Sequence, residues 1–300
     1  MKALPVFYCD NVVSQVQSFS PSAGKPAEVV ASWQELNIPF TIESFEPVTK
    51  ENIELAHAPS YVDGVFSGAI KNGFRNNEIA VAQSCRYTVG ALFAASKHAL
   101  VNKQVAIAPV SGFHHAGFAN SYGYCTFNGL LVTALLLKQQ GLVKTIGILD
   151  LDVHEGDGSQ EIIETLKLQE WIVHHSLGYA VSPVPENADS YLIQLPEVIT
   201  SMQHCDLIIF QASADPHIDD PLGGFLTTEQ LRTRDRIVFE ECAKQGIPLV
   251  WNIAGGYQRD DQGSIAPVLR LHDITLMECA KVYLYKSSPN KIDNDEIGND

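Results

Sequence analysis

Short apolar runs alternate along the chain with longer segments in which apolar residues recur at helical spacing. The runs are rich in β-branched and aromatic residues and predict strands at Ala3–Tyr8, Gln104–Ala108, Thr145–Leu149, Trp171–His174, Leu207–Phe210 and Pro248–Ile253. The longer segments predict helices at Lys25–Leu36, Ser60–Ser67, Ile79–Leu100, Asn128–Gln139, Gly158–Leu168, Thr228–Gln245 and Ser264–Tyr285. Unbroken apolar strands separated by helices are typical of a parallel sheet covered on both faces. We therefore expect an α/β fold, a single domain with a mostly parallel central sheet flanked by helices on both faces, whose ligands bind at the carboxyl ends of the strands.

The alternating pattern continues to residue 286 without a repeat, a low-complexity block or a visible domain boundary. The last residues, 287–300, are polar and acidic, and we expect them to form a disordered tail. The N-terminus lacks the apolar run and cleavage site of a signal peptide, and no window approaches the roughly 18 apolar residues of a membrane span. These features predict a cytoplasmic protein without a membrane partner.

The chain is acidic, with 35 Asp and Glu residues against 20 Lys and Arg residues and a net charge of −15. This excess disfavours nucleic acid as a partner and would attract a cationic ligand such as a lysine-rich tail or a polyamine, unless it only keeps the protein soluble. The six cysteines include no Cys-x-x-Cys pair, which favours reduced, buried thiols over a disulfide framework or a structural zinc cluster. Nothing in the sequence predicts the oligomeric state.

Ionisable residues stand at alternate positions where one predicted strand ends. Residues 148–158 read Ile-Leu-Asp-Leu-Asp-Val-His-Glu-Gly-Asp-Gly, and alternation places Asp150, Asp152 and His154 on one side of the strand. A carboxylate and an imidazole on adjacent same-side positions can both reach a metal at about 2.0–2.2 Å, and this ligand pair suits Zn²⁺. Asp157 then turns the chain into a helix, so the alternative is a loop whose polar groups only cap that helix.

A second strand leads to another carboxylate. Asp215 stands closest to the end of the strand that begins at Leu207, where the ligands of an open sheet converge. Together with Asp152 and His154 it makes two carboxylates and one histidine, which leave a coordination position open, as in a catalytic zinc site. We interpret the neighbouring His217, Asp219 and Asp220 as loop or turn residues.

Two adjacent histidines, His114 and His115, follow the strand that ends at Ala108. Such a pair can supply a general base and an electrostatic partner for a metal-bound water. Each imidazole would need its other ring nitrogen fixed by a carboxylate, and Asp150 and Asp157 are the natural partners. Taken alone, the pair could equally fill core or surface positions.

A fourth strand ends in Gly255-Gly256 before Tyr257. The glycines let the backbone approach a ligand closely, and the tyrosine hydroxyl can donate a hydrogen bond to the oxygen of a scissile carbonyl. Four predicted strands therefore deliver polar groups to the same edge of the sheet.

These residues together resemble the zinc-dependent histone deacetylase and acetylpolyamine amidohydrolase family, whose fold is related to arginase. The similarity runs from Pro21 to Tyr285 and is carried by Gly112-Phe-His-His-Ala116, Gly123-Tyr-Cys125, Asp150-Leu-Asp-Val-His-Glu-Gly-Asp-Gly158, Ala214-Asp215 with Asp220-Pro-Leu-Gly223, and Gly255-Gly-Tyr257.

The resemblance implies a zinc-dependent amide hydrolase that removes acetyl or longer acyl groups from the lysine side chains of a peptide or protein, with an acylated polyamine as the alternative substrate. The implied roles are zinc ligands (Asp152, His154, Asp215), a tandem histidine pair with its orienting carboxylates (His114 with Asp150, His115 with Asp157), a transition-state donor (Tyr257), tunnel walls (Gly123, Tyr124) and a residue near the tunnel mouth (Leu222). The resemblance also implies a structural K⁺ held by backbone oxygens around Asp150, Asp152 and His154.

The sequence departs from the family pattern in three places. Gly112-Phe113 replaces the usual Pro-Gly before the histidine pair, Glu155 replaces a more common His or Gln, and no second aromatic wall of the tunnel can be assigned within the short stretch 174–196. The last departure predicts an open mouth that admits a peptide, so we favour a lysine substrate over a polyamine.

Two rival functions follow from the same motifs. A two-metal ureohydrolase of the arginase type needs Asp-x-His-x-Asp, but the last position here is Gly156. A non-catalytic module that binds acyl-lysine would be expected to lack a metal ligand, a tandem histidine or the tyrosine, and none of these is missing.

Overall fold

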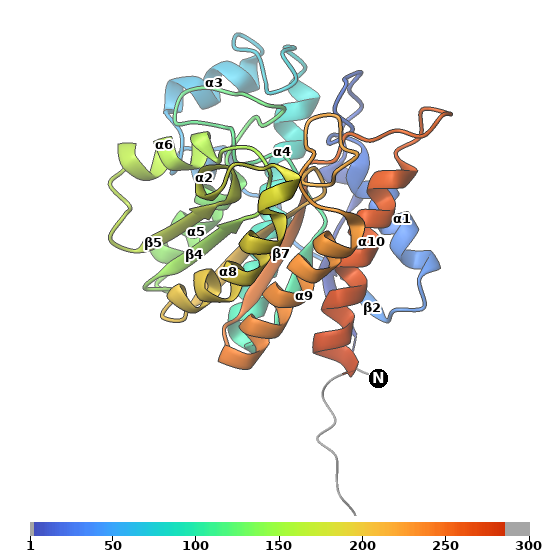
Figure 1. Ribbon diagram of the computed structural model, residues 1–300. Coiled ribbons are helices and arrows are strands. Elements are labelled where there is room, and N and C mark those ends of the chain that lie inside the picture. The colour runs from blue at the N-terminus through green and yellow to red at the C-terminus, as the bar shows by residue number, and fades with distance from the viewer. Residues whose placement is uncertain (1–2, 286–300) are drawn as a thin grey trace, which may run out of the picture.

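A single parallel sheet forms the centre of the protein in a computed structural model that describes residues 3–285 (Figure 1). The strand order is β2-β1-β3-β7-β6-β4-β5, and every neighbouring pair is parallel. The strands are β1 (Leu4–Phe7), β2 (Phe40–Glu43), β3 (Val105–Ala108), β4 (Ile146–Asp150), β5 (Ile172–Ser176), β6 (Leu207–Ser213) and β7 (Leu249–Ala254). The predicted fold class is therefore confirmed. The predicted acidic tail, 287–300, lies outside the described residues.

Helices cover both faces of the sheet (Figure 1). The described helices of four or more residues are α1 (Lys25–Glu35), α2 (Lys50–Ile53), α3 (Pro59–Ser67), α4 (Ile79–Asn102), α5 (Gly129–Gln139), α6 (Asp157–Thr165), α7 (Leu177–Ala180), α8 (Ala188–Ser201), α9 (Thr228–Gln245), α10 (Ala266–Ala280) and a π-helical turn at Lys281–Tyr285. Helices α1, α8, α9 and α10 pack on one side, and α3, α4 and α5 pack on the other.

The strands divide their side chains between two hydrophobic cores because successive residues point to opposite faces. In β6, Ile208 and Phe210 join the core under α8 and α9, whereas Leu207 and Ile209 join the core under α4 and α5. This division explains why the central strands read as unbroken apolar runs, since neither face of the sheet contacts water.

Some elements were not predicted from the pattern. Strand β2 is a short edge strand whose residues are only partly buried or exposed, and it carries no unbroken apolar run. Helix α8 contains Pro196 in its interior, a residue that normally interrupts a helical pattern because it removes a backbone hydrogen bond. The stretch after β5 is therefore a helical connection rather than only a short loop.

A buried arginine ties together the ends of two central strands. Arg234, on α9, is fully buried and donates from Nη1 to the carbonyl oxygen of Ser213 at 2.7 Å and from Nε to Asp235 at 2.8 Å. Asp235 in turn accepts a hydrogen bond from Thr275 at 2.7 Å. The guanidinium is thus paired and hydrogen-bonded, as a buried charge requires, and it fixes the carboxyl end of β6 from behind.

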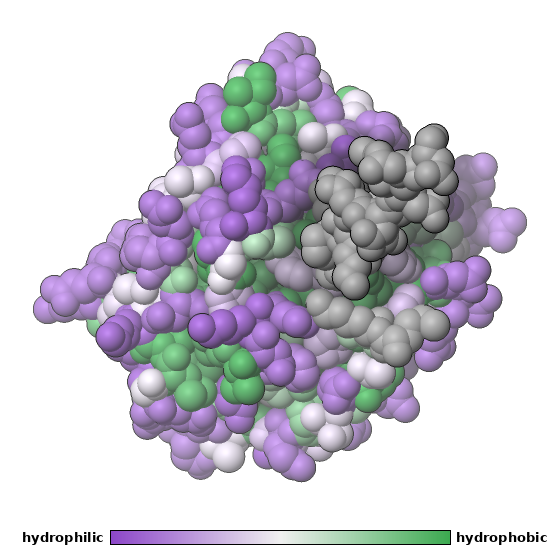
Figure 2. Space-filling model, turned by 90° about the horizontal axis from the view of Figure 1, so that it is seen from below, coloured by the Kyte–Doolittle hydropathy of each residue, from purple (hydrophilic) through white to green (hydrophobic). Residues whose placement is uncertain are grey.

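The face of the molecule shown in Figure 2 has a mixed surface. On the face turned to the viewer in Figure 2, outside the grey atoms, apolar side chains form separate patches among hydrophilic ones, as on an ordinary water-exposed surface. Across residues 3–285, no helix combines the length and apolarity needed to cross a membrane. All six cysteines are free thiols; four are buried, but Cys9 and Cys85 are partly exposed, contrary to the expectation of a fully buried set.

Candidate metal centre and active site

Three potential metal ligands meet where β4 and β6 end. Asp152, His154 and Asp215 each offer a ligand atom, and these atoms all lie within 4.8 Å of one another. His154 Nδ1 is 2.9 Å from Asp152 Oδ1 and 3.3 Å from Asp215 Oδ2. The structure therefore brings together the three residues that the sequence singled out as a ligand set.

Loop hydrogen bonds, rather than the pleat of a strand, hold these residues. Strand β4 ends at Asp150, so the alternation used to predict a common side for Asp150, Asp152 and His154 does not extend to the last two residues. The backbone N–H of Asp152 donates to Asp150 Oδ1 at 3.2 Å, and that of His154 donates to Asp152 Oδ1 at 3.1 Å. Each acidic side chain thus folds back on the loop that follows it, which aims the next ligand inward.

The cluster has the negative charge of two carboxylates and an oxygen atom free to bind a divalent cation. Asp152 and Asp215 are both buried, and among the described residues Asp215 Oδ2 has no hydrogen-bond donor. Burial and the negative charge of Asp152 raise the pKa of Asp215. Burial alone would lower the pKa of His154, but the two carboxylates raise it to about 11.

These pKa shifts all indicate a site with excess negative charge. Ligand atoms around a tetrahedral zinc lie about 3.3–3.6 Å apart, given bonds of about 2.0–2.2 Å. The separation of His154 Nδ1 from Asp215 Oδ2, 3.3 Å, matches this spacing, and its separation from Asp152 Oδ1, 2.9 Å, is somewhat shorter. The residues present therefore fit a zinc ion.

The tandem histidines lie beside this cluster in two different environments. His114 is buried, and its Nδ1 is 2.8 Å from Asp150 Oδ2, while its Nε2 faces Asp152 at 3.8 Å. His115 is more accessible, and its Nδ1 is 2.6 Å from Asp157 Oδ1. The two rings are 4.0 Å apart between centroids. Each histidine therefore has the carboxylate partner that was predicted for it.

The different surroundings separate the pKa values of the two imidazoles. Burial would lower the pKa of His114, but the carboxylates of Asp150, Asp152 and Asp215 raise it to about 9. Burial and the neighbouring His114 lower the pKa of His115 below its usual value. This arrangement favours a charged imidazole at His114 and a neutral one at His115. A neutral His115 whose Nδ1–H is donated to Asp157 keeps a lone pair on Nε2.

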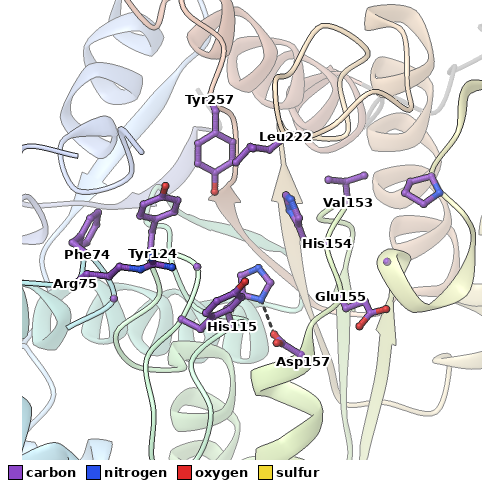
Figure 3. A pocket seen from close by; sticks show the side chains of 15 residues that line it. Phe74, Arg75, His115, Tyr124, Val153, His154, Glu155, Asp157, Leu222 and Tyr257 are labelled. Atoms are coloured by element: carbon purple, nitrogen blue, oxygen red, sulfur yellow. Dashed lines mark hydrogen bonds and ion pairs between the residues drawn. The ribbon is translucent and has the colours of Figure 1, made fainter. Parts of the chain in front are cut away.

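Tyr257 faces the cluster from the end of β7. The ring packs at 5.9 Å against Phe19 and at 6.0 Å against Tyr124, and the hydroxyl points into the pocket (Figure 3). Burial and the carboxylates of Asp215 and Asp152 raise its pKa well above the usual value, so the hydroxyl stays protonated and can donate.

The first glycine of the Gly255-Gly256 pair before Tyr257 is required by close packing. A Cβ at Gly255 would lie 2.3 Å from Asp215 Oδ2 and 2.3 Å from Ser213 Oγ, and the backbone there has a φ of +47°. Only glycine combines that conformation with that contact. The double-glycine motif thus brings Tyr257 close to the ligand cluster.

A cavity of 730 Å³ opens above these groups, lined by Gly73, Phe74, Arg75, His115, Tyr122, Gly123, Tyr124, Val153, His154, Glu155, Asp157, Gly178, Pro183, Leu222 and Tyr257. In Figure 3, Phe74, Arg75 and Tyr124 lie on one side, Val153 and Glu155 lie on the other, and Leu222 lies beside Tyr257. Gly123, Tyr124 and Leu222 are among the residues that line the cavity, and their contact with a substrate stays a prediction. Val153 lines the wall facing Tyr124, and the stretch 174–196 contributes Gly178 and Pro183 to the pocket but no aromatic ring.

Three supporting residues were not recognised in the sequence. Asp220, interpreted there only as a turn residue, is buried and accepts a hydrogen bond from the backbone N–H of Tyr257 at 2.7 Å as well as one from Leu222 at 3.0 Å. Gln211 donates to Asp150 Oδ1 at 2.8 Å. Lys25 is fully buried, and its ammonium group donates to the carbonyl oxygen of Gly255. A lysine directly before the proline of a predicted helix was the only available signal for that contact.

Comparisons with known proteins agree with this geometry. The model of the histone deacetylase domain matches residues 22–177. An uncharacterized protein of Picosynechococcus sp. is 28% identical over 228 residues, which are 69% of this chain and 76% of that protein. Histone deacetylase 15 of Arabidopsis thaliana is 28% identical over 214 residues, which are 59% of this chain and only 38% of that protein. This chain thus spans well under half the length of that plant protein.

Solved structures share the fold at low sequence identity. The HD domain of HDA15 superposes with a TM-score of 0.72 and 19% identity, covering 96% of this chain and 91% of that one. An acetylpolyamine aminohydrolase from Burkholderia pseudomallei superposes with a TM-score of 0.69 and 15% identity, covering 94% of this chain and 99% of that one. At these identities the likeness establishes the fold alone.

Proposed function

This chain belongs to the histone deacetylase family, and from that premise we propose that it is a zinc-dependent amide hydrolase that removes acyl groups from lysine side chains. The observation that carries the proposal is the position of two buried carboxylates, Asp152 and Asp215, beside His154, which lines the pocket. Next to them lie two histidines that each contact a carboxylate. In a purely structural role, the two buried carboxylates of Asp152 and Asp215 would be compensated by His154 and by neutral donors such as the hydroxyl of Ser213, whereas a divalent cation balances both charges.

Asp152, His154 and Asp215 would hold the zinc ion. When bound there, zinc supplies a Lewis acid that polarises the amide carbonyl and lowers the pKa of a bound water from 15.7 to about 7. The structural K⁺ that the family resemblance implies stays a prediction.

The protein's own side chains supply the proton transfers. His115, whose Nδ1 is fixed by Asp157, accepts a proton from the attacking water on Nε2 and later donates a proton to the leaving amine nitrogen. His114, held by Asp150, and the hydroxyl of Tyr257 stabilise the negative charge that develops on the carbonyl oxygen. Water is consumed, the C–N bond breaks, and a carboxylic acid and a free amine are released.

The pocket favours lysine over polyamine substrates. One wall carries Phe74, Tyr124 and the cation Arg75, and the opposite wall carries Val153 and the anion Glu155, with Asp157 below it. Asp157 is already paired with His115, so the opening offers few unpaired carboxylates to a polycation. A polyamine remains the alternative substrate, because one structural neighbour is an acetylpolyamine aminohydrolase.

The two rival functions have less support. Gly156 occupies the position where a two-metal ureohydrolase would carry a bridging carboxylate. A binding module would not need His115, Asp157 and Tyr257 to line the pocket together, as they do here.

A substrate panel tests this proposal. For the zinc-loaded protein, kcat/KM for a peptide with acetyl-lysine is expected to exceed that for acetylputrescine and acetylspermidine, because the opening matches few amine charges. The panel also includes a longer-acyl peptide, whose relative kcat/KM defines the acyl length accepted. A preference of tenfold or more for a polyamine, removed by added salt, would contradict the lysine assignment.

A further inference from the structure

One cation on the pocket wall is not used by the mechanism above. Arg75 lies beside Phe74 and Tyr124, and its side chain extends from its loop into the pocket rather than away from the protein (Figure 3). Among residues 3–285, its guanidinium makes no ion pair, side-chain hydrogen bond or ring contact. The fold itself therefore does not use this positive charge.

The backbone that carries Arg75 is strained and held in place. Its φ of +61° lies in the left-handed region, which is unfavourable for a residue other than glycine. The N–H of Arg75 donates to the carbonyl oxygen of Asn72 at 2.9 Å, and the N–H of Phe74 donates to Asn72 Oδ1 at 2.9 Å. Asn72 also bonds to Asn76 through both its backbone and its side chain.

The same loop is fastened to the pocket wall. The N–H of Gly73 donates to Thr126 Oγ1 at 3.0 Å, and a Cβ on Gly73 would lie 2.5 Å from the backbone of Cys125. The ring of Phe74 is 6.0 Å from that of Tyr124. The loop is therefore docked on the segment that forms the pocket wall, and the position of Arg75 relative to the pocket is fixed.

We propose that Arg75 forms a carboxylate-binding subsite at the mouth of the pocket, so that the preferred substrates are acylated amines that carry a carboxylate at the end remote from the acyl group. This inference rests on the proposed function, because it assumes that the acylated nitrogen lies at the base of the same pocket. The α-carboxylate of a chain-terminal or free Nε-acyl-lysine has this chemistry, and so does an acidic side chain next to an internal acyl-lysine.

The charge of the pocket selects a single carboxylate as the ligand. A guanidinium offers a planar pair of donors that matches a carboxylate, and one such group satisfies one monoanion. The net charge of −15 would repel anions at long range, but interactions beyond about 8 Å are screened at physiological salt, so the local cation determines binding at the mouth. The facing Glu155 is positioned to disfavour a second anion on the other side.

The test compares two small substrates that differ only in the carboxylate. One is Nε-acetyl-lysine with a capped α-amine and a free α-carboxylate, and the other is its α-carboxamide. For the zinc-loaded wild-type protein, we expect kcat/KM for the carboxylate to be about tenfold higher, the effect of one charge-assisted pair at a partly exposed site. Arg75→Gln should bring the ratio close to one, and Arg75→Lys should keep part of it, because an ammonium retains the charge without the planar fork.

Two further arms complete the experiment. Arg270→Gln, which removes an exposed arginine on α10, is the matched control and should keep the tenfold ratio. A capped peptide with an internal acetyl-lysine followed by Glu identifies the source of the anion. If kcat/KM is raised for this peptide, relative to the same peptide with Gln, but does not differ between the two small substrates, the carboxylate that binds Arg75 belongs to a neighbouring side chain. The inference would be overturned by a wild-type ratio near one for the two small substrates together with no gain for the Glu peptide, or by a gain that Arg75→Gln leaves unchanged.

A failure of the proposed function can be told apart from a failure of the subsite. If the zinc-loaded protein hydrolyses neither compound, the proposed function fails. In that case, calorimetric binding of the two compounds to the wild type and to Arg75→Gln tests the subsite by itself. The wild type should bind the carboxylate with a Kd about tenfold lower than that of the carboxamide, and equal Kd values for the two compounds would contradict the subsite.

Discussion

Asp215→Ala is expected to lose zinc and, with it, deacylase activity. Asp215 is one of the three proposed ligands and one of the two buried carboxylates among them. Even partners outside the ligand set typically change metal affinity by about 10–100-fold, so the loss of a ligand should exceed about 100-fold. Metal analysis after dialysis, with turnover of an acetyl-lysine peptide measured in parallel, gives the result.

A neighbouring carboxylate provides the control for that experiment. Asp219 lies on the same loop, and its side chain is 79% exposed, so Asp219→Ala should keep both zinc and activity. Asp215→Asn keeps the shape of the side chain and removes its charge, and it should also lose zinc. Stoichiometric zinc in either Asp215 variant would show that the ligand assignment is wrong.

His115→Ala and Tyr257→Phe are expected to retain zinc and substrate binding but to turn over slowly. His115 is the proposed general base, a role typically worth a factor of about 10²–10⁴ in rate, and Tyr257 is the proposed oxyanion donor, worth about 10²–10³ in kcat. The change should fall mainly on kcat, because both groups act most strongly in the transition state. Steady-state kinetics on the zinc-loaded variants measure the effect.

An exposed tyrosine outside the pocket separates this effect from a general loss of structure. Tyr179 is 50% exposed on α7, and Tyr179→Phe should leave kcat unchanged. A near-normal kcat in both His115→Ala and Tyr257→Phe would show that the proton-transfer groups lie elsewhere.

The sequence was sufficient to predict the central sheet and the groups at its edge. The strands β3, β4, β6 and β7 are buried on both faces, and buried parallel strands leave unbroken apolar runs in the sequence. The polar residues that follow β4 and β6 converge because the carboxyl ends of parallel strands share one edge. The residues around Asp152 and Asp215 in the sequence were therefore enough to predict that the two carboxylates lie at the same edge of the sheet.

The supporting residues could not be predicted in this way because their roles depend on contacts between distant segments. Lys25 and Gly255 are 230 positions apart, and Asp220 reaches the backbone of Tyr257 across 37 positions. Arg75 stands in a polar stretch that reads as an ordinary loop. Its significance depends on the left-handed backbone and on the docking of that loop against Cys125 and Thr126, which no local pattern reveals.

Hydrolysis of acyl-lysine amides by this protein is proposed to require one zinc ion, held by Asp152, His154 and Asp215. The most direct measurement titrates metal-free protein with Zn²⁺ and follows the release of acetate from an acetyl-lysine peptide. Activity is expected to rise in proportion to added zinc and to level off at one equivalent per chain. Full activity in the metal-free protein, or activity that appears only with two Mn²⁺ ions per chain, would contradict the claim.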